Sequence, residues 1–398
     1  MKLIQLCNTY GLTTGIGRNV EELHEYLLNL GEESFVICYG LESNYRTKVN
    51  FFNFEDRADQ KVHALLSRLT GLQGYFSFSV TEKVIKKIEE LNPDIVMLHA
   101  LHNNAVNIQA LLSYLSNNHI KTIIVLHDCW WYTGHCCHYT ESNCFRWKDS
   151  CGNCPQKHRW NKSWFFDQSQ KVLSDRKKLF DAFDSLYVIG VSDWITDEAK
   201  HSILQNANEL KRIYNWVDTS VFCPDKYNET YQSDVICVAT SFSESKGFSY
   251  IVKAAEENPV LHFNLIGKLN SNIPLPSNIH AIGSVDNPSE LACYYASSKL
   301  FLNPTIQESF GKTTAEALAC GTPAIVFDTT ALKELVDEKT GICVPLGDQS
   351  SLNRAIHAVL KNGKDHYSAA CRLKAQSLFD AKKNMDAYRF FMQQIMGL

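Results

Sequence analysis

Short apolar runs rich in β-branched residues alternate with longer amphipathic segments along this chain, and this alternation limits the folds open to it. Such runs, taken as predicted strands, cover residues 2–7, 34–39, 94–99, 122–127 and 186–191, and then 235–239, 262–266, 299–302 and 322–327. Continuous apolar strands separated by helical stretches are typical of parallel sheets covered by helices. The sequence therefore predicts an α/β fold.

The length of 398 residues suggests two domains, at about 150 residues for each domain. Tyr214 to Pro224, with the polar segment 225–234, has the character of a linker between two such units. We expect a Rossmann-like domain at 1–215, a second at 216–375, and a C-terminal helix within 376–398 that packs back on the first domain. Ligands of parallel sheets bind outside the carboxyl ends of the strands, which favours a cleft between the domains.

Composition excludes several classes of protein. The net charge of −4 is too weak to indicate nucleic acid as the main partner. No run approaches the roughly 18 apolar residues of a membrane span, and the N-terminal apolar run, which ends at Cys7, is a predicted strand and not a signal peptide. Fourteen cysteines in a chain without an export signal indicate reduced thiols in the cytosol, and hence reactivity or metal binding rather than disulfides.

The window from Asn303 to Pro323 is the most informative. A predicted strand ends near Leu302, a loop carries Glu308, and a helix is expected to begin between Ser309 and Gly311. Free backbone N–H groups at such a helix start suit a diphosphate. If the segment were helical throughout, Glu308 and Glu316 would be separated by about 12 Å of helical rise. Two solvated carboxylates are the usual interpretation of such a pair, but the surrounding Ser-Phe-Gly and Ala-Cys-Gly-Thr-Pro favour a site.

With these motifs the sequence resembles the retaining glycosyltransferases of family four, which have the GT-B fold of two Rossmann-like domains facing a cleft. Four further motifs support the resemblance: the phosphate-loop motif at 241–247 with its Lys-Gly pair, two strand ends at 265–268 and 281–285, and Tyr214-Asn-Trp-Val-Asp218 at the start of the second domain. The family usually has an arginine five residues before the lysine, where this chain has Ser241.

The resemblance implies a role for each matching residue. Lys246 would stabilise the charge that builds on the departing phosphate, Glu308 would hold sugar hydroxyls and Glu316 the ribose hydroxyls. No divalent metal would then be required. Lys268 is either a second cation for the phosphates or a solvated lysine. The predicted donor-binding set is Gly15, Gly17, Lys246, Lys268, Glu308, Ser309, Phe310, Gly311 and Glu316.

The N-terminal half contributes a glycine turn and several histidines. Gly15-x-Gly17 lacks the third glycine of a dinucleotide fingerprint, so it is either the family's donor-approach loop or a tight turn. His127 ends a predicted strand at the cleft edge, where the family has a histidine that contacts the transferred sugar, and we expect it to be catalytic with Lys246 and Glu308. His99 and His102 end the preceding strand and either line the acceptor pocket or, as is slightly favoured, are satisfied polar loop residues. Residues 130–132 are either sugar-stacking or core aromatics.

Residues 127–155 resemble a subgroup that assembles capsular, O-antigen or colanic-acid type polysaccharides on a lipid-diphosphate-linked acceptor at the inner face of the bacterial cytoplasmic membrane. Residues 156–180 then contain seven Lys or Arg against two Asp, interleaved with Trp and Phe. Such a segment suits an anionic membrane interface, although a solvated helix face beside core aromatics explains it equally well. Residues 61–78 are a further possible part of an acceptor or lipid groove.

Cysteines cluster in the same region. Cys136, Cys144, Cys151 and Cys154 are predicted to hold a structural zinc, with His135, Cys137 and His138 as spare ligands. The gap between Cys151 and Cys154 lets both sulfurs face one ion, but the other gaps match no standard zinc finger. Four buried unpaired thiols are an equally favoured alternative.

These observations predict a retaining glycosyltransferase that uses a nucleotide-diphosphate sugar and a glycan acceptor. Its expected location is the cytoplasm, peripherally bound at the inner membrane face. A sugar-nucleotide epimerase or hydrolase of the same fold would turn over the donor without an acceptor. A non-enzymatic, Cys-rich metal-binding interaction protein would not turn it over at all.

Overall fold

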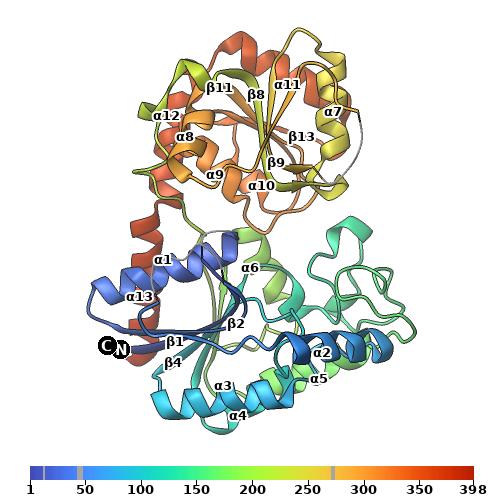
Figure 1. Ribbon diagram of the computed structural model, residues 1–398, viewed down its shortest axis with the longest axis vertical. Coiled ribbons are helices and arrows are strands. Elements are labelled where there is room, and N and C mark those ends of the chain that lie inside the picture. Colours follow the sequence, from blue (N-terminus) through green and yellow to red (C-terminus); the bar gives the residue numbers. More distant parts are fainter. Residues whose placement is uncertain (12–13, 43–47, 270–273) are drawn as a thin grey trace. The chain divides into compact units, whose positions relative to one another are not determined.

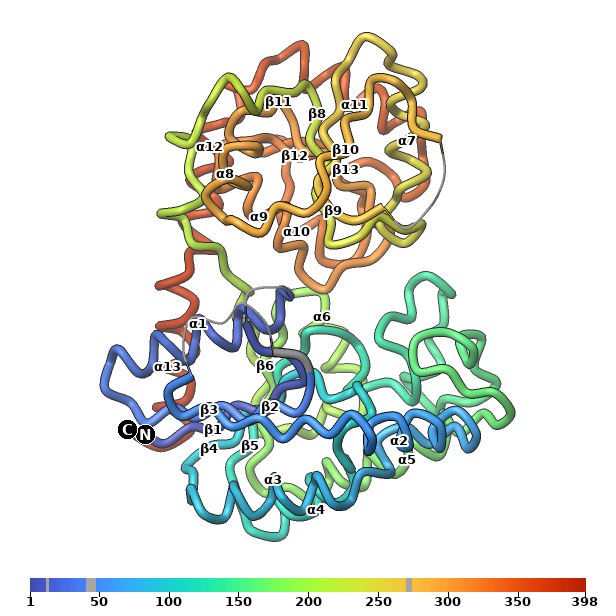
Figure 2. Tube along the Cα trace, viewed as in Figure 1, coloured from blue at the N-terminus to red at the C-terminus, as the bar shows by residue number. Residues whose placement is uncertain are grey.

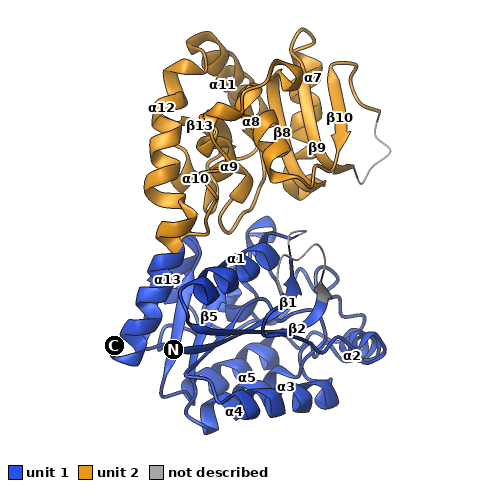
Figure 3. Cartoon of the chain, turned by 60° about the vertical axis from the view of Figure 1, so that its left-hand side comes forward, with its two compact units in different colours: residues 1–213, 385–398 blue, residues 214–384 orange. Residues whose placement is uncertain are grey.

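A computed structural model describes residues 1–11, 14–42, 48–269 and 274–398. It divides into two compact units, which are coloured separately in Figure 3. Unit 1 contains residues 1–213 and 385–398, and unit 2 contains residues 214–384. Each unit is one parallel sheet with helices on its faces (Figure 1).

Unit 1 has a seven-stranded sheet in the order β3-β2-β1-β4-β5-β6-β7. Its strands are β1 (Lys2–Tyr10), β2 (Glu33–Glu42), β3 (Phe51–Asn53), β4 (Ile95–Leu98), β5 (Lys121–Leu126), β6 (Leu186–Gly190) and β7 (Glu209–Arg212). Every neighbouring pair runs parallel, so the segments that follow β1, β2, β4 and β5 all leave the sheet at one edge. That edge is where side chains for a ligand are expected.

The helices of unit 1 cover both faces of this sheet, with α3, α4 and α5 on one face and α1 and α13 on the other (Figures 1 and 3). They are α1 (Gly15–Asn29), α2 (Arg57–Thr70), α3 (Phe78–Leu91), α4 (Ile108–Asn117), α5 (Ser169–Asp181) and α6 (Asp193–Lys200). Helix α13 (Ala381–Met396) crosses the boundary between the units, and its part within unit 1 packs Phe391 on Tyr187 and pairs Arg389 with Glu32.

Unit 2 has a six-stranded parallel sheet in the order β10-β9-β8-β11-β12-β13, which can be followed along the trace in Figure 2. Its strands are β8 (Ser233–Phe242), β9 (Phe263–Leu269), β10 (Ile279–Gly283), β11 (Ser298–Asn303), β12 (Ala324–Phe327) and β13 (Gly341–Val344). Its helices are α7 (Phe248–Glu257), α8 (Pro288–Ser297), α9 (Lys312–Ala319), α10 (Leu332–Leu335), α11 (Gln349–Asn362) and α12 (Asp365–Lys374).

The predicted α/β architecture with two parallel sheets is confirmed. All nine predicted strands occur, because each is an apolar run buried on both faces. Four short strands, β3, β7, β10 and β13, lie at or next to sheet edges and were not among those nine. All four are partly exposed, and β3, β7 and β10 carry polar side chains that interrupt the apolar run typical of a central strand. β13 is the short run Gly-Ile-Cys-Val, of which only the two end residues are buried.

Candidate active site

Lys246 and Glu308 form an ion pair in unit 2, and both side chains are partly exposed. Lys246 ends a short 3-10 turn (Glu244–Lys246) after β8, and Glu308 lies in the loop after β11. The two loops are joined because the Ile306 N–H donates to the Ser245 carbonyl at 3.1 Å. The structure thus brings together the two residues that the sequence predicts at the leaving phosphate and the sugar.

The backbone conformation and the surroundings of Gly247 explain why a glycine follows Lys246. Its φ of 72° lies in the left-handed region, and a Cβ there would approach the Pro304 carbonyl oxygen to 2.0 Å. Any side chain at this position would therefore push the lysine loop away from the loop that carries Glu308. The glycine fixes the spacing between the cation and the carboxylate.

The helix after Glu308 starts later than the sequence suggests. Helix α9 begins at Lys312 with Gly311 as its N-cap at φ 94°, so Glu308 lies outside it. The assumption that the segment from Glu308 to Glu316 is helical throughout is wrong, and the 12 Å rise does not apply. The left-handed backbone of Gly311 separates the loop from the helix.

Three other members of the donor set lie around this helix start. Ser309 is buried, and within the described residues its hydroxyl has no hydrogen-bond partner. Glu316 is also buried, and its carboxylate accepts from the Tyr295 hydroxyl at 3.2 Å. Phe310 is buried against Tyr214 and Phe379, so it anchors the loop through packing. Because buried polar groups normally have a hydrogen-bond partner, the unsatisfied Ser309 hydroxyl is the group here that most favours a polar ligand.

Lys268 lies exposed near the end of β9, directly opposite Ser241 of β8 in the parallel register. Ser241 occupies the position where the family has arginine. Within the described residues, no ion pair neutralises Lys268. A cation is therefore available next to the position of the missing one.

The two glycines of the N-terminal turn differ in their surroundings. A Cβ on Gly17 would meet the Gly11 carbonyl oxygen and the Thr14 hydroxyl, each at 2.8 Å, whereas a Cβ on Gly15 would meet nothing within 4 Å. The Thr14 side chain caps α1 by accepting from the Gly17 N–H at 3.0 Å. Gly17 is thus needed for the turn itself, while Gly15 leaves open space at the start of the helix.

His127 follows β5 and lies beside His99, which follows β4. His99 Nδ1 and His127 Nε2 are 3.0 Å apart, and His99 Nε2 is 3.1 Å from Gln5 Oε1. Burial, together with His127, lowers the pKa of His99 well below its ordinary value, so this ring is neutral. Because Gln5 Oε1 only accepts, the network assigns the His99 proton to Nε2 and leaves Nδ1 to accept from His127.

His99 is therefore more than an ordinary polar loop residue. It fixes the orientation of the His127 ring and places the proton of that ring on Nε2. His102 makes a different contact, with its Nε2 2.9 Å from Asp128 Oδ2. Burial opposes charge on this ring, but Asp128 and Cys137 together raise the pKa of His102 well above its ordinary value. Burial also opposes charge on Asp128, but His102 lowers its pKa, so the two form an ion pair.

The aromatics that follow Asp128 belong to the core. Trp130, Trp131 and Tyr132 are each at most 1% exposed, which rules out a sugar-stacking surface in this structure. The Trp131 indole N–H donates to the His99 carbonyl at 3.0 Å. Arg176 is buried beneath them, with its guanidinium 4.1 Å from the Trp130 ring centroid. These side chains hold the histidine segment in place.

The burial of Arg176 also corrects the predicted basic surface at 156–180. Arg176 donates to the Thr133 carbonyl at 2.8 Å. Three other basic residues of the segment are paired with carboxylates: Arg159 with Glu141, Lys171 with Asp175 and Lys177 with Asp181. The uncompensated basic surface is thus smaller than the sequence count suggests, and Lys157 and Lys162 lie in the loop beside the exposed rings.

The four cysteines of the predicted zinc set lie near one another. Burial, together with the nearby thiols of Cys154, Cys151 and Cys144, raises the pKa of Cys136 to about 12. Burial, with Cys144 among the neighbours, raises the pKa of Cys151 and Cys154 to about 11. Backbone N–H groups donate to two of the sulfurs, from Gly134 to Cys151 and from Gln156 to Cys154. Donors of this kind support a thiolate.

The spacing of these sulfurs is wider than in a closed metal site. Within the described part of the chain, the one set of three His, Cys, Asp or Glu ligand atoms that lie within 4.8 Å of one another is His102, Asp128 and Cys137. The spare ligand Cys137 therefore lies with the His102–Asp128 pair and not with the four cysteines. The zinc site stays a prediction.

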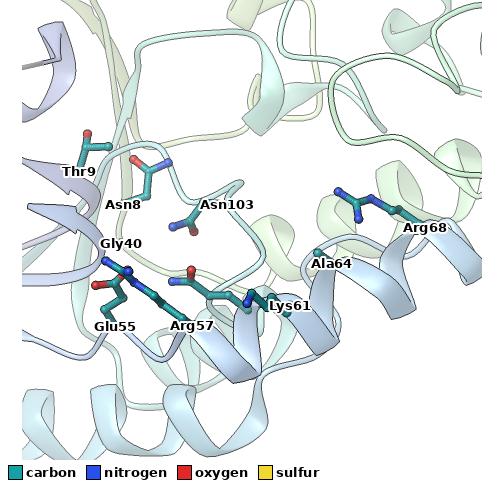
Figure 4. Close-up of a pocket in the computed structure, with 10 residues that line it drawn as sticks. Asn8, Thr9, Gly40, Glu55, Arg57, Lys61, Ala64, Arg68 and Asn103 are labelled. Carbon is teal, nitrogen blue, oxygen red and sulfur yellow. The ribbon is translucent and has the colours of Figure 1, made fainter.

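Sequence reasoning missed a pocket at the same sheet edge as His127 (Figure 4). Asn8 near the end of β1, Gly40 near the end of β2 and Asn103 after β4 line it together with α2. Asn8 and Asn103 were detectable in principle, since both lie at or beyond the carboxyl ends of apolar runs. Neither belongs to a motif, and asparagine is common in loops.

Two sheets of parallel strands, with the Lys246–Glu308 pair and the helix start in one unit, are the arrangement of a GT-B glycosyltransferase. Among solved structures, the sucrose-phosphate synthase of Thermosynechococcus elongatus matches 100% of both chains at a TM-score of 0.74 and 16% identity. Anabaena HepE in complex with UDP matches 99% of this chain and 100% of its own at a TM-score of 0.67 and 16% identity. These likenesses show the fold.

Family models cover both units. Residues 13–221, more than half of the chain, match Glycosyltransferase Family 4, and residues 224–376 match Glycosyl transferases group 1. The chain belongs to Glycosyltransferase Family 4, and it is a glycosyltransferase.

Curated relatives match over shorter stretches. Phosphatidyl-myo-inositol mannosyltransferase of Mycobacterium leprae is 35% identical over 100 residues, which is 24% of this chain and 26% of the relative. An uncharacterised 41.2 kDa protein in the cps region of Klebsiella pneumoniae is 27% identical over 196 residues, or 46% of this chain and 54% of the relative. The matches thus span between a quarter and about half of these relatives. None of the described helices has the length and apolar character of a membrane span.

Proposed function

We propose that this glycosyltransferase moves a sugar from a nucleotide-diphosphate donor to a glycan acceptor with retention of anomeric configuration. The observation that carries the proposal is the Lys246–Glu308 pair beside the buried, unsatisfied hydroxyl of Ser309. A cation, a carboxylate and a hydroxyl on adjoining loops suit phosphate and sugar hydroxyls together. A helix start follows directly at Lys312 and adds backbone N–H groups.

The proposed chemistry needs no divalent metal. As the bond between the anomeric carbon and the diphosphate oxygen breaks, negative charge grows on that oxygen, and Lys246 stabilises it. The acceptor hydroxyl forms the new bond on the same face and passes its proton to the departing phosphate. Glu308 holds sugar hydroxyls and Glu316 the ribose hydroxyls. The ion pair with Lys246 positions the Glu308 carboxylate to accept from sugar hydroxyls.

His127 is proposed to contact the transferred sugar, with His99 as its positioning residue. His99 Nδ1 accepts from His127 Nε2, and this bond fixes the orientation of the His127 ring. This assignment rests on the strand-end position of His127 and on the family resemblance.

We further propose a lipid-linked acceptor in surface polysaccharide synthesis, with peripheral membrane binding. The support is the exposure of Trp164, Phe165 and Phe166, which are 47%, 63% and 58% exposed and follow one another in the loop after Lys162. The cps-region relative and the phosphatidylinositol-directed relative act as analogies for this role. A structural zinc on the four cysteines is proposed as well, because two of their sulfurs accept backbone N–H groups. Binding would draw together sulfurs that lie wider apart than in a closed site.

A donor screen followed by product analysis tests the proposed function. Nucleoside diphosphates and their sugars are added to the full chain with EDTA present, and binding is followed as a rise in melting temperature. At 100 times the dissociation constant a ligand adds about 2.7 kcal/mol of apparent stability, so a true donor is visible. Proton NMR of the first product must show the donor's anomeric configuration. An inverted product contradicts retention, and donor turnover at full rate without acceptor favours the hydrolase or epimerase.

A further inference from the structure

Three side chains of unit 1 that can bind a metal, and that the proposed mechanism does not use, lie close together. His102 follows β4, Asp128 follows β5, and Cys137 lies in the loop between β5 and α5. One ligand atom from each side chain lies within 4.8 Å of the other two, and His102 Nε2 is 2.9 Å from Asp128 Oδ2. Because β4 and β5 are parallel neighbours, their ends bring the imidazole and the carboxylate to one place, and the loop adds the thiol.

Backbone hydrogen bonds hold two of these residues in position. The Trp130 N–H donates to Asp128 Oδ1 at 2.9 Å, so the other carboxylate oxygen, Oδ2, is the one that contacts His102. The Cys129 N–H donates to the Cys137 carbonyl at 2.7 Å and ties the returning loop to the residue after Asp128. Hydrogen bonds of this kind orient metal ligands before an ion binds.

The chemistry of the three groups suits zinc. Zn²⁺ accepts imidazole nitrogen, thiolate sulfur and carboxylate oxygen, whereas Mg²⁺ and Ca²⁺ prefer oxygen ligands alone. Without metal, His102 and Asp128 form an ion pair. Burial, together with Asp128, raises the pKa of Cys137 to about 11, so its side chain is then a neutral thiol. Zn²⁺ displaces one proton from the imidazolium and one from the thiol, so the net charge of the cluster is zero before and after binding.

The geometry leaves one coordination position open. Tetrahedral zinc holds such ligand atoms about 3.3–3.6 Å from one another, which the three side chains reach through small adjustments. The side chains of His102 and Asp128 are 24% and 13% exposed, so an ion can enter from solvent. Three protein ligands leave the fourth position to water. Because it has a single thiolate, we expect the site to be filled by added metal and to lose it during purification.

We propose that His102, Asp128 and Cys137 form an exchangeable zinc site in unit 1, with water as the fourth ligand. The site is separate from the four cysteines predicted to hold a structural zinc, because Cys137 lies with the His102–Asp128 pair. The ion takes no part in the proposed sugar transfer, which is assayed with EDTA present. This inference can therefore fail without the proposed function, and the proposed function can fail without it.

Cobalt(II) titration of the full chain tests the site, because cobalt replaces zinc in tetrahedral sites and a thiolate ligand gives it a charge-transfer band. Zinc affinity is then measured by displacement of the bound cobalt. We expect His102→Gln and Cys137→Ser each to weaken zinc binding at this site about tenfold or more. Cys137→Ser should also lose the charge-transfer band of this site, and added Mg²⁺ should not displace the cobalt. Melting temperatures in EDTA check that both variants are folded.

His119→Gln is the matched control. His119 Nδ1 lies 2.6 Å from Asp184 Oδ2, and within the described residues this exposed pair belongs to no set of three ligands. The variant should bind zinc as the wild type does. Cys151→Ser, which disrupts the four-cysteine set, should retain the affinity and the band of the proposed site.

Wild-type zinc affinity in Cys137→Ser, or a wild type that binds no cobalt, would overturn the inference. Equal weakening in His119→Gln would overturn it too, since the effect would then not be specific to the cluster. Loss of all cobalt binding in folded Cys151→Ser protein would assign the metal to the four cysteines and likewise contradict the site.

Discussion

Lys268 and Ser241 are register partners on neighbouring strands, and this pairing suggests how the chain manages without the family's arginine. Side chains of register partners in a parallel sheet lie next to each other on the same face, so Lys268 lies next to the position of the lost cation. We expect Lys268→Ala to weaken nucleoside diphosphate binding about tenfold, the effect of one charge-assisted contact.

Calorimetry with the best nucleoside diphosphate checks this prediction. Lys339→Ala, on an exposed turn of the same unit, is the matched control and should bind as the wild type does. Wild-type affinity in Lys268→Ala would mean that this lysine is simply solvated. Lys246 and the helix start would then have to neutralise both phosphate charges.

His63 shows a second residue-scale effect, because its tautomer follows from its partners. Its Nε2 accepts from the Gly74 N–H at 3.1 Å, so Nδ1 carries the proton toward the Ser77 hydroxyl at 2.8 Å. Burial lowers the pKa of His63 to about 4. The unfolded ring titrates near 6.5, so acid favours the unfolded state: stability falls as the pH drops below about 6.5 and the loss is complete below about 4.

His63→Gln retains a side-chain acceptor but does not titrate. Between pH 7.5 and pH 5, its free energy of unfolding should fall by about 2 kcal/mol less than that of the wild type. Urea unfolding at both pH values measures the difference. The exposed His357→Gln should retain the wild-type dependence, and an equally steep loss in His63→Gln would contradict the buried neutral ring.

At the scale of elements, the stability of the loop from 129 to 155 depends on whether its cysteines bind a metal. If they bind zinc, the metal replaces a missing apolar core, since this stretch contains only short 3-10 turns. We expect close to one zinc per chain in protein purified without chelator. Cys151→Ser should lose the metal and melt at a lower temperature, whereas Cys293→Ser on α8 should retain it.

Elemental analysis together with the melting temperature decides between the alternatives. Well-folded protein without metal would leave these cysteines as packing residues, in keeping with sulfurs that lie wider apart than in a closed site.

Sequence patterns predicted central elements better than edges and turns. Buried strands such as β5 and β11 carry continuous apolar runs, so the positions of these strands were predicted correctly, with His127 directly after β5 and Asn303 at the end of β11. The start of α9 was misplaced because only the left-handed Gly311 ends the preceding loop, and a glycine in a sequence does not reveal its φ. The burial of Arg176 was not predictable either, since it depends on carbonyls more than forty positions away in the sequence.

At the scale of the whole molecule, the exposed rings at 164–166 predict binding to anionic membranes. Basic residues near an anionic surface contribute about 1 kcal/mol each, and salt screens the gain. The full chain should float with anionic but not with neutral liposomes, and Trp164→Ser/Phe165→Ser should reduce that fraction several-fold. Phe390→Ser, which removes an equally exposed ring on α13, should float normally. Equal flotation with neutral vesicles would refute an electrostatic membrane surface.

The central claim is that unit 2 holds the diphosphate of a nucleotide sugar through Lys246 without a divalent metal. Its most direct test is the rate of nucleoside diphosphate release from the cognate donor, measured with acceptor and EDTA for the wild type and Lys246→Ala. Loss of a preorganised charge at the leaving oxygen should slow the variant about 100-fold or more. Lys253→Ala, on the exposed face of α7, should retain the wild-type rate. A wild-type rate in Lys246→Ala, or a rate that appears only when magnesium or manganese is added, would contradict the account.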